Sequence, residues 1–275
     1  MGIRINTNIA SINTQRHLLN ATQAFAKSME KLSSGLRITR AGDDAAGLAI
    51  SESLKADIRA LNQASRNASD GISMLQTAEG AMDEVSNILQ RMKELAQQSL
   101  NGTLGDSERE YLDLEYSALV EEMDRIAATT DFNGVKMLDG TGGIVGIQVG
   151  ITNLPDDRIA VDLSQSQTAG DLGITSSVLT VAEAQNAMGE IDVAIQNVVR
   201  ARAGWGAVQN RLESTIRNIS MTAENLSAAN SRIRDVDVAY ETSKMTSYQI
   251  LQQAGISMLS QANLVPGLAL SLLVS

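Results

Sequence analysis

The feature that most constrains this chain is a long apolar repeat that no proline interrupts. Between residues 54 and 96, apolar and small residues recur in alternating steps of four and three, with one slip after residue 75. Such spacing places one side of a helix against a partner, so it predicts a single coiled-coil helix over most of residues 44–99. The repeat consists of Leu54, Ile58, Leu61, Ser65, Ala68, Ile72, Leu75, Ala78, Met82, Val85, Leu89, Met92 and Ala96.

Two further runs have the same helical spacing. One covers residues 112–126 and follows Ser107-Glu108-Arg109-Glu110, which we interpret as a capping box because Ser and Glu stand three residues apart. The other starts at a second capping box, Thr180-Val181-Ala182-Glu183, and continues to Tyr240. Residues 101–106 separate the first two helices, and their Asn and Gly content predicts the turn of a helical hairpin.

The length of these helices predicts the shape of the molecule. About 60 helical residues span roughly 90 Å at about 1.5 Å each. A compact chain of 275 residues would be only about 48 Å across. The sequence therefore predicts a mainly α fold, built as a long antiparallel coiled-coil rod.

The segment between the second and third runs has a different composition. Residues 131–179 are rich in Gly, Thr, Ser and Asp, and Ile147, Val149 and Ile151 alternate as strand residues do. A second alternating set, Ile159, Val161 and Leu163, follows the turn-forming sequence of residues 153–157. We expect a small β-hairpin at one end of the helical bundle.

Both ends of the chain have helical spacing, but their apolar stripes are weak. Small and polar residues occupy many stripe positions, and an isolated helix is marginal in water, so each end needs a partner. We expect the terminal helices to form a coiled coil with each other and with neighbouring copies, and to order only on assembly. The stripes are Leu18, Thr22, Phe25, Met29 and Leu32 at the N-terminal end, and Tyr248, Leu251, Gly255, Met258, Ala262 and Val265 at the C-terminal end.

These patterns predict four parts of the chain. An N-terminal inner-core helix and connector occupy residues 1–43, and rod helices with the hairpin occupy residues 44–179. A C-terminal rod helix follows over residues 180–238. A C-terminal inner-core helix covers residues 239–275.

Composition excludes several classes of function. The chain has 22 Lys and Arg against 32 Asp and Glu, a net charge of −10, which argues against nucleic-acid binding. It has no Cys, and His17 is its one His, so disulfides, zinc ribbons, thiol catalysis and His-based metal sites are not expected. The sequence has no run of 18 apolar residues, and we expect no membrane insertion.

No catalytic constellation is evident in the sequence. It lacks the motifs of a serine-nucleophile elbow, a nucleotide-binding loop and a zinc peptidase, so we expect no enzyme activity, no cofactor and no bound metal. Residues 140–143 could suggest a phosphate cradle, but turn chemistry is the favoured interpretation. Asp43-Asp44 and Asp156-Asp157 could hold a cation, although a helix N-terminus and a turn explain them more simply.

Several short motifs at both ends of the chain resemble bacterial flagellin, and the resemblance covers essentially the whole sequence. Few residues separate the expected hairpin from the last long helix, so the chain is similar to a minimal flagellin without outer domains. Near the last proline it reads Leu264-Val265-Pro266-Gly267-Leu268, which departs from the Gln-rich pattern common in the family. The matching motifs are Met1-Gly2-Ile3-Arg4-Ile5-Asn6-Thr7-Asn8, Lys31-Leu32-Ser33-Ser34-Gly35-Leu36-Arg37-Ile38, Asp43-Asp44-Ala45-Ala46-Gly47, Asp131-Phe132-Asn133-Gly134 and Ile250-Leu251-Gln252-Gln253-Ala254-Gly255.

The resemblance implies a structural subunit of the extracellular flagellar filament, exported through the flagellar type III apparatus and polymerising with itself for motility. It also implies three kinds of partner: an export chaperone, a filament cap and junction proteins. The alternatives are a hook-filament junction protein, a secreted hydrolase on a flagellin scaffold, and a dedicated receptor ligand.

The resemblance also implies two sets of functional residues. Arg91, Leu95 and Glu115 match positions at which several flagellins contact a Toll-like innate receptor of the host, and burial between subunits is the alternative role of that surface. The terminal helices would carry assembly through Ile5, Ile9, Ile12, Leu18, Phe25, Leu32, Leu251, Met258, Val265, Leu270 and Leu273.

Overall fold

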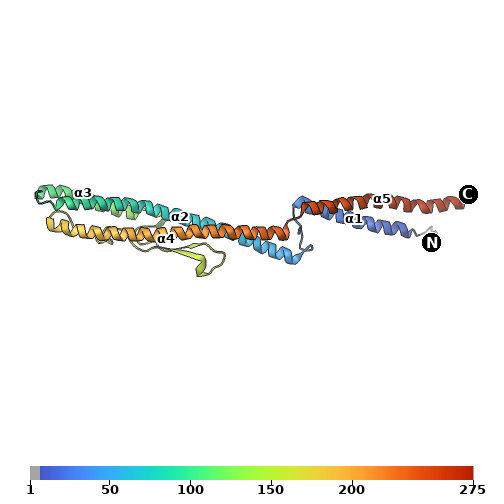
Figure 1. Cartoon of the computed structure of the whole chain (residues 1–275), viewed down its shortest axis with the longest axis horizontal. Helices are drawn as coiled ribbons and strands as arrows, with labels where there is room; N and C mark the ends of the chain where they lie inside the picture. Colours follow the sequence, from blue (N-terminus) through green and yellow to red (C-terminus); the bar gives the residue numbers. More distant parts are fainter. Residues whose placement is uncertain (1–6, 275) are drawn as a thin grey trace. The chain divides into compact units, whose positions relative to one another are not determined.

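The computed structural model describes the backbone of residues 7–274 and the side chains of residues 7–264 (Figure 1). It is mainly α-helical with a small β-hairpin, as the sequence predicts. The chain packs as two compact units, a central unit of Asp57–Glu224 and a terminal unit of Met1–Ala56 with Asn225–Ser275. Its elements are α1 (Ile9–Ser34), α2 (Ala45–Ser99), α3 (Asp106–Thr129), β1 (Asp131–Phe132), β2 (Val135–Lys136), β3 (Gly143–Gln148), a short 3-10 helix (Pro155–Asp157), β4 (Arg158–Leu163), α4 (Val181–Arg234) and α5 (Val238–Val274).

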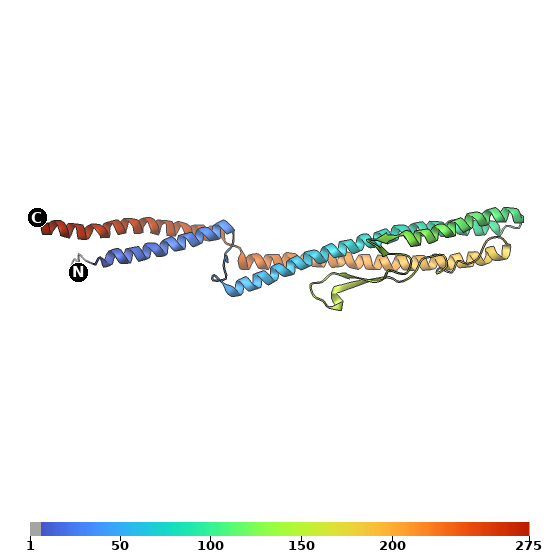
Figure 2. The ribbon, with the colours of Figure 1, turned by 180° about the vertical axis from the view of Figure 1, so that it is seen from behind.

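The core of the central unit lies between α2, α3 and α4, which run alongside one another (Figures 1 and 2). The predicted repeat supplies much of this core, because its members from residue 75 to residue 96 are all buried. The single helix predicted over residues 44–99 is confirmed as α2. The large side chains with almost no exposed surface include Leu75, Met82, Leu89, Met92, Met123, Ile191 and Leu212.

The α2–α3 turn differs from the prediction. Helix α3 begins at Asp106 after Gly105, no side chain caps it, and Ser107 lies inside its first turn, so the proposed capping box is wrong. Arg109 organises the turn instead. Its guanidinium is buried and donates to the carbonyls of Ser99, Asn101 and Leu104. A cation at this point satisfies the Ser99 carbonyl, which the end of α2 leaves without a helical partner, and two carbonyls of the turn.

The second capping box is confirmed at the start of α4. The Glu183 backbone N–H donates to Thr180 Oγ1 at 3.2 Å, and the Thr180 backbone N–H donates to Glu183 Oε2 at 3.1 Å. These reciprocal bonds satisfy donors that lack partners in the first turn of a helix.

The helix predicted to reach Tyr240 ends earlier, at Arg234. Asp235 leaves the helical path to form a β-bridge with Leu36, and the Val236 N–H donates to the carbonyl of Gly35. Asp237 then accepts from the Tyr240 N–H and starts α5. The apolar spacing continues across this break, which is why periodicity alone did not reveal it.

The predicted β-hairpin is formed by β3 and β4, which pair antiparallel from Gly143 opposite Leu163 to Gln148 opposite Arg158. Val149 and Ile151, which were expected in the first strand, lie beyond its end. The buried face of the hairpin packs on the middle of α2 and α4, and not at one end of the bundle as expected. A Cβ at Gly71 of α2 would overlap Ile147, and the Trp205 indole of α4 donates to the carbonyl of Asp162 at 3.3 Å.

A second, shorter hairpin was not predicted. Strands β1 and β2 pair through Asp131 with Lys136 and Phe132 with Val135. Asn133 and Gly134 form the turn with φ of 50° and 82°. An Asn-Gly pair is the typical signal of such a turn, so the sequence contained the evidence.

In the terminal unit, α1 and α5 lie side by side (Figure 1). The first turns of α2 meet the end of α4 in the same unit, where Ser51 Oγ donates to Asn230 Oδ1 at 2.7 Å and Arg234 pairs with Glu52. The predicted part boundaries at residues 44, 180 and 239 lie next to the starts of α2, α4 and α5. The four-part division itself stays a prediction.

Candidate functional site

The contact between α1 and α5 follows a regular heptad. The less exposed residues of α5 recur in steps of four and three, and a matching set recurs along α1. The two sets combine large apolar side chains, such as Phe25 of α1 and Leu259 of α5, with small and polar residues. The α5 set is Glu241, Met245, Tyr248, Gln252, Gly255, Leu259 and Ala262, and the α1 set includes Ser11, Thr14, Leu18, Ala21, Phe25, Ser28 and Leu32.

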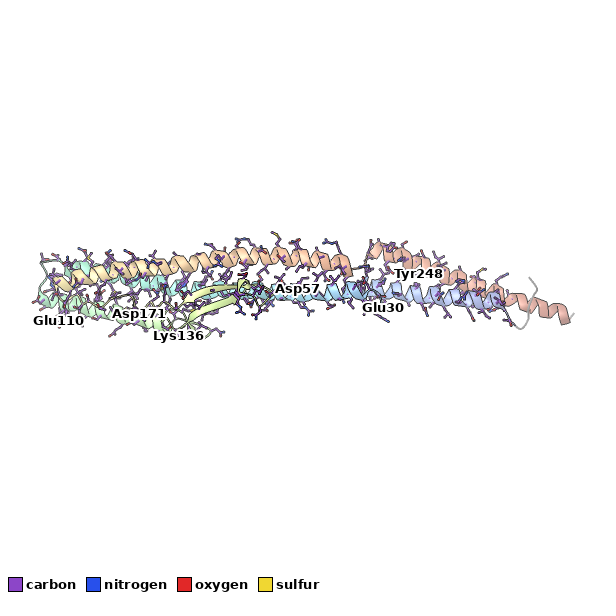
Figure 3. All side chains as sticks on the ribbon, turned by 90° about the horizontal axis from the view of Figure 1, so that it is seen from below. Glu30, Asp57, Glu110, Lys136, Asp171 and Tyr248 are labelled. Carbon is purple, nitrogen blue, oxygen red and sulfur yellow. The ribbon has the colours of Figure 1, made fainter. Side chains whose placement is uncertain are left out.

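Polar groups also join the two terminal helices along this contact. Ser28 Oγ donates to Glu241 Oε1 at 2.6 Å, and both residues are buried. Farther along, Gln252 Nε2 donates to Thr22 Oγ1 at 2.9 Å. Close approach is possible where α5 has Gly255. Figure 3 places Tyr248 on the same helix.

Large apolar side chains lie on the other faces of these helices. Ile9 and Ile12 of α1 are each 56% exposed, and Leu251 and Met258 of α5 are 56% and 62% exposed. Leu251 and Met258 were assigned to the same stripe as Gly255, but they lie outside the helix contact. Other exposed apolar residues that the prediction missed are Leu19, Ile250, Ile256 and Leu264.

The predicted assembly residues therefore fall into different groups. Leu18, Phe25 and Leu32 are half-buried in the contact between α1 and α5. Four others, Ile9, Ile12, Leu251 and Met258, are exposed. Ile5 lies outside the described residues, as do the side chains of Val265, Leu270 and Leu273.

The acidic residues at the connector serve the local fold. Asp43 lies 2.6 Å from Lys27 Nζ and accepts from the hydroxyl and the backbone N–H of Thr39. The Lys27 ammonium first, and then the Thr39 hydroxyl, hold the pKa of the Asp43 carboxyl well below its usual range. Asp44 accepts from the Gly47 N–H at 2.9 Å, as a helix N-cap does.

The second acidic pair has a similar role. Asp157 accepts from the N–H and the hydroxyl of Thr152 in the hairpin loop. Within residues 7–264, no group of three or more acidic, His or Cys side chains is arranged to hold a metal ion.

The three residues matched to receptor contact do not share one environment. Arg91 lies 2.8 Å from Glu115 Oε1 and 3.0 Å from Glu94 Oε2, on an exposed surface of α2 and α3. Leu95 is 1% exposed and belongs to the core of the central unit. Leu95, which the resemblance matched to receptor contact together with Arg91, is therefore not accessible on the surface of the central unit.

No helix in the described part of the chain is long and apolar enough to cross a membrane. His17, the one His, is exposed on α1.

Comparison with known proteins places the chain in a family. The model of the bacterial flagellin N-terminal helical region matches residues 5–142, and that of the C-terminal helical region matches residues 188–273. The chain is 50% identical over 273 residues to flagellin of Halalkalibacterium halodurans, covering 98% of this chain and 99% of the relative. It is 44% identical to the flagellar filament 33 kDa core protein of Treponema phagedenis, again covering 98% and 99%.

A solved structure agrees with the sequence comparison. The crystal structure of Bacillus cereus flagellin matches with a TM-score of 0.51 and 34% identity, over 60% of this chain and 94% of that chain. Two family models cover most of the sequence, and relatives match it over nearly its full length. The chain therefore belongs to the bacterial flagellin family.

Proposed function

We propose that copies of this chain polymerise through the apolar side chains that α1 and α5 direct away from their mutual contact. As a flagellin, the chain is a structural protein of the extracellular flagellar filament, it assembles with itself, and it is not an enzyme. One observation carries the proposal: Ile9, Ile12, Leu251 and Met258 are large apolar side chains that stay exposed outside the contact between the terminal helices.

Burial of these exposed side chains provides free energy for assembly. Full burial of a large apolar side chain contributes about 1.5–3 kcal/mol. Several such side chains on each helix could offset the ordering and association costs of docking a subunit. A neighbouring copy presents the same side chains, so a second copy of the chain is a suitable partner.

A substitution test asks whether polymerisation needs these particular side chains or any exposed apolar side chain. We expect Leu251→Glu with Met258→Glu to leave the helical content of the monomer unchanged and to abolish seeded polymerisation. Met221→Glu, in α4, is the matched control because Met221 is 65% exposed but lies in the central unit. Electron microscopy and light scattering after seeding provide the readout. Normal filaments from the double variant would refute the proposal.

Export and capping partners follow from the same surface. An apolar helix face that is covered only in the polymer needs protection beforehand, which supports an export chaperone on the C-terminal helix. The filament cap and the junction proteins would meet the same terminal helices. The alternative of a hook-filament junction protein is not favoured, because full-length relatives at 44–50% identity are flagellins and filament core proteins.

We also propose that the monomer contacts a host Toll-like receptor through Arg91 and Glu115. Their exposed ion pair supports this second function. Leu95→Ala would open a core cavity, so Arg91→Ala with Glu115→Ala is the cleaner test. Receptor signalling unchanged by that double variant would remove the proposal.

A further inference from the structure

We propose that Asn101 is a site of spontaneous deamidation, and that the fold protects the chain's other Asn-Gly sequence from the same reaction. Asn-Gly occurs at residues 101–102 and 133–134. In this reaction the backbone nitrogen of the glycine attacks Cγ of the asparagine and ammonia leaves, which forms a cyclic imide. Water then opens the imide at either carbonyl, giving aspartate or isoaspartate. Water is the one reactant required.

The folded structure hinders attack at Asn133. Its neighbour Gly134 lies in the tight turn between β1 and β2, and the Gly134 N–H donates to Asp131 Oδ2 at 3.2 Å. The attacking nitrogen must lose this proton, and a hydrogen bond to a carboxylate opposes that loss. Strand pairing on both sides also restricts movement of the Asn133 side chain toward the peptide that follows it.

The environment of Asn101 is different. Asn101 and Gly102 are both exposed in the α2–α3 turn, and the Gly102 N–H has no hydrogen-bond acceptor among the described residues. Asn101 Oδ1 accepts from the Thr103 N–H at 3.2 Å. This bond draws electrons from the side-chain carbonyl and folds the side chain over the peptide that carries the nucleophile. The nitrogen and the carbonyl carbon at Asn101 are therefore both available for reaction.

The products would affect the turn in different ways. The carbonyl of Asn101 accepts from Arg109 Nη2 at 3.2 Å and from the Leu104 N–H at 3.2 Å. Aspartate keeps this carbonyl in place and adds a negative charge near Arg109. Isoaspartate routes the main chain through the former side chain and displaces the carbonyl. The isoaspartate product should therefore loosen the turn, whereas the aspartate product should not.

The experiment compares the two sites within one sample. Unpolymerised protein is incubated at mildly alkaline pH, folded and in denaturant, and peptides containing each asparagine are followed by mass spectrometry. In the folded protein, we expect Asn101 to deamidate at least about tenfold faster than Asn133, since a charge-assisted hydrogen bond is of the strength that changes a rate by that factor. In denaturant, the two rates should converge.

Two variants test the stated causes. Asp131→Ala releases the Gly134 N–H and should raise the rate at Asn133. Gly102→Ala adds a methyl group where nothing lies within 4 Å, so it should slow the reaction at Asn101 without a packing change. Equal rates in the folded protein, or an Asn133 rate unaffected by Asp131→Ala, would overturn the proposal. Because the measurement uses unpolymerised protein, its result is independent of the proposed assembly surface.

Discussion

Arg109 should be among the most destabilising positions to substitute in the central unit. Its side chain is 5% exposed and carries a positive charge, and its partners are the hydroxyl of Ser99 and the carbonyls of Ser99, Asn101 and Leu104. Arg109→Met keeps most of the apolar part of the side chain and removes the charged guanidinium group. The substitution therefore isolates the contribution of these hydrogen bonds.

The structure sets the expected magnitude. Asn101 is exposed and Leu104 is half-buried, so water can replace Arg109 at their carbonyls. Ser99 is buried, and an unsatisfied buried carbonyl costs about 1–3 kcal/mol. Loss of a cation at the C-terminal end of α2 adds about 0.3–1 kcal/mol. We expect Arg109→Met to lower the free energy of unfolding of the central unit by about 2–4 kcal/mol.

Denaturant unfolding followed by circular dichroism measures the total effect, and amide hydrogen exchange at residues 99–104 locates it. Arg125→Met is the matched control, because Arg125 is exposed on α3 and pairs with Glu122 one turn away. Exposed pairs of this kind contribute about 0.5 kcal/mol. If the two variants lose the same stability, the role assigned to Arg109 is wrong.

The other predictions concern glycine packing, a half-buried carboxylate and the terminal helices. Gly71→Ala requires the terminal methyl of Ile147 to move aside, so it should gain less stability in thermal unfolding than Gly80→Ala. Gly80→Ala lies in open space on the same helix and should stabilise by about 0.5–1 kcal/mol. Burial raises the pKa of Glu190, but hydrogen bonds from Thr175 and Ser176, in the loop before α4, lower it by more. The pKa of Glu190 is therefore below its ordinary value. The ionised Glu190 carboxylate therefore stabilises the folded state. This stabilisation should be complete above the unfolded pKa of about 4.3 and be lost as the pH falls through the folded pKa. Glu190→Gln should remove this pH dependence from unfolding curves measured at several pH values. Ser28→Ala leaves the buried Glu241 without its donor and should weaken pairing of α1 with α5 by about 1–3 kcal/mol, measured by hydrogen exchange of α1 amides.

The long helices could be predicted from the sequence because their core positions repeat without interruption. The start of α4 was also predictable, because its capping bonds join Thr180 and Glu183, which are only three residues apart. The end of α4 was not, because Asp235 leaves the helix to pair with Leu36, a residue far away in the sequence. Arg109 was missed although its partners are only 5 to 10 residues away. A helix of alternating charge indicates solvent exposure, and nothing local shows that this arginine turns back toward α2.

For the terminal helices, the sequence predicted the pairing but not the face on which each side chain lies. The heptad spacing indicated two helices needing a partner, and α1 and α5 do pair. Spacing alone could not say which face each side chain occupies, since exposed and contact residues alternate at similar intervals along α5. Leu251 and Gln252 are neighbours, yet Gln252 enters the contact and Leu251 does not.

This arrangement has a physical consequence for assembly. The contact between α1 and α5 includes Leu18 and Phe25, so the two helices can pair, but large apolar side chains such as Leu251 remain outside it. If these side chains also lay in the contact, the pair would be more stable alone and a neighbour would gain less by docking. Because they lie outside it, the hydrophobic free energy of burying them is available only when copies meet. Moving that apolar surface into the α1–α5 contact should therefore stabilise the monomer and weaken the polymer together.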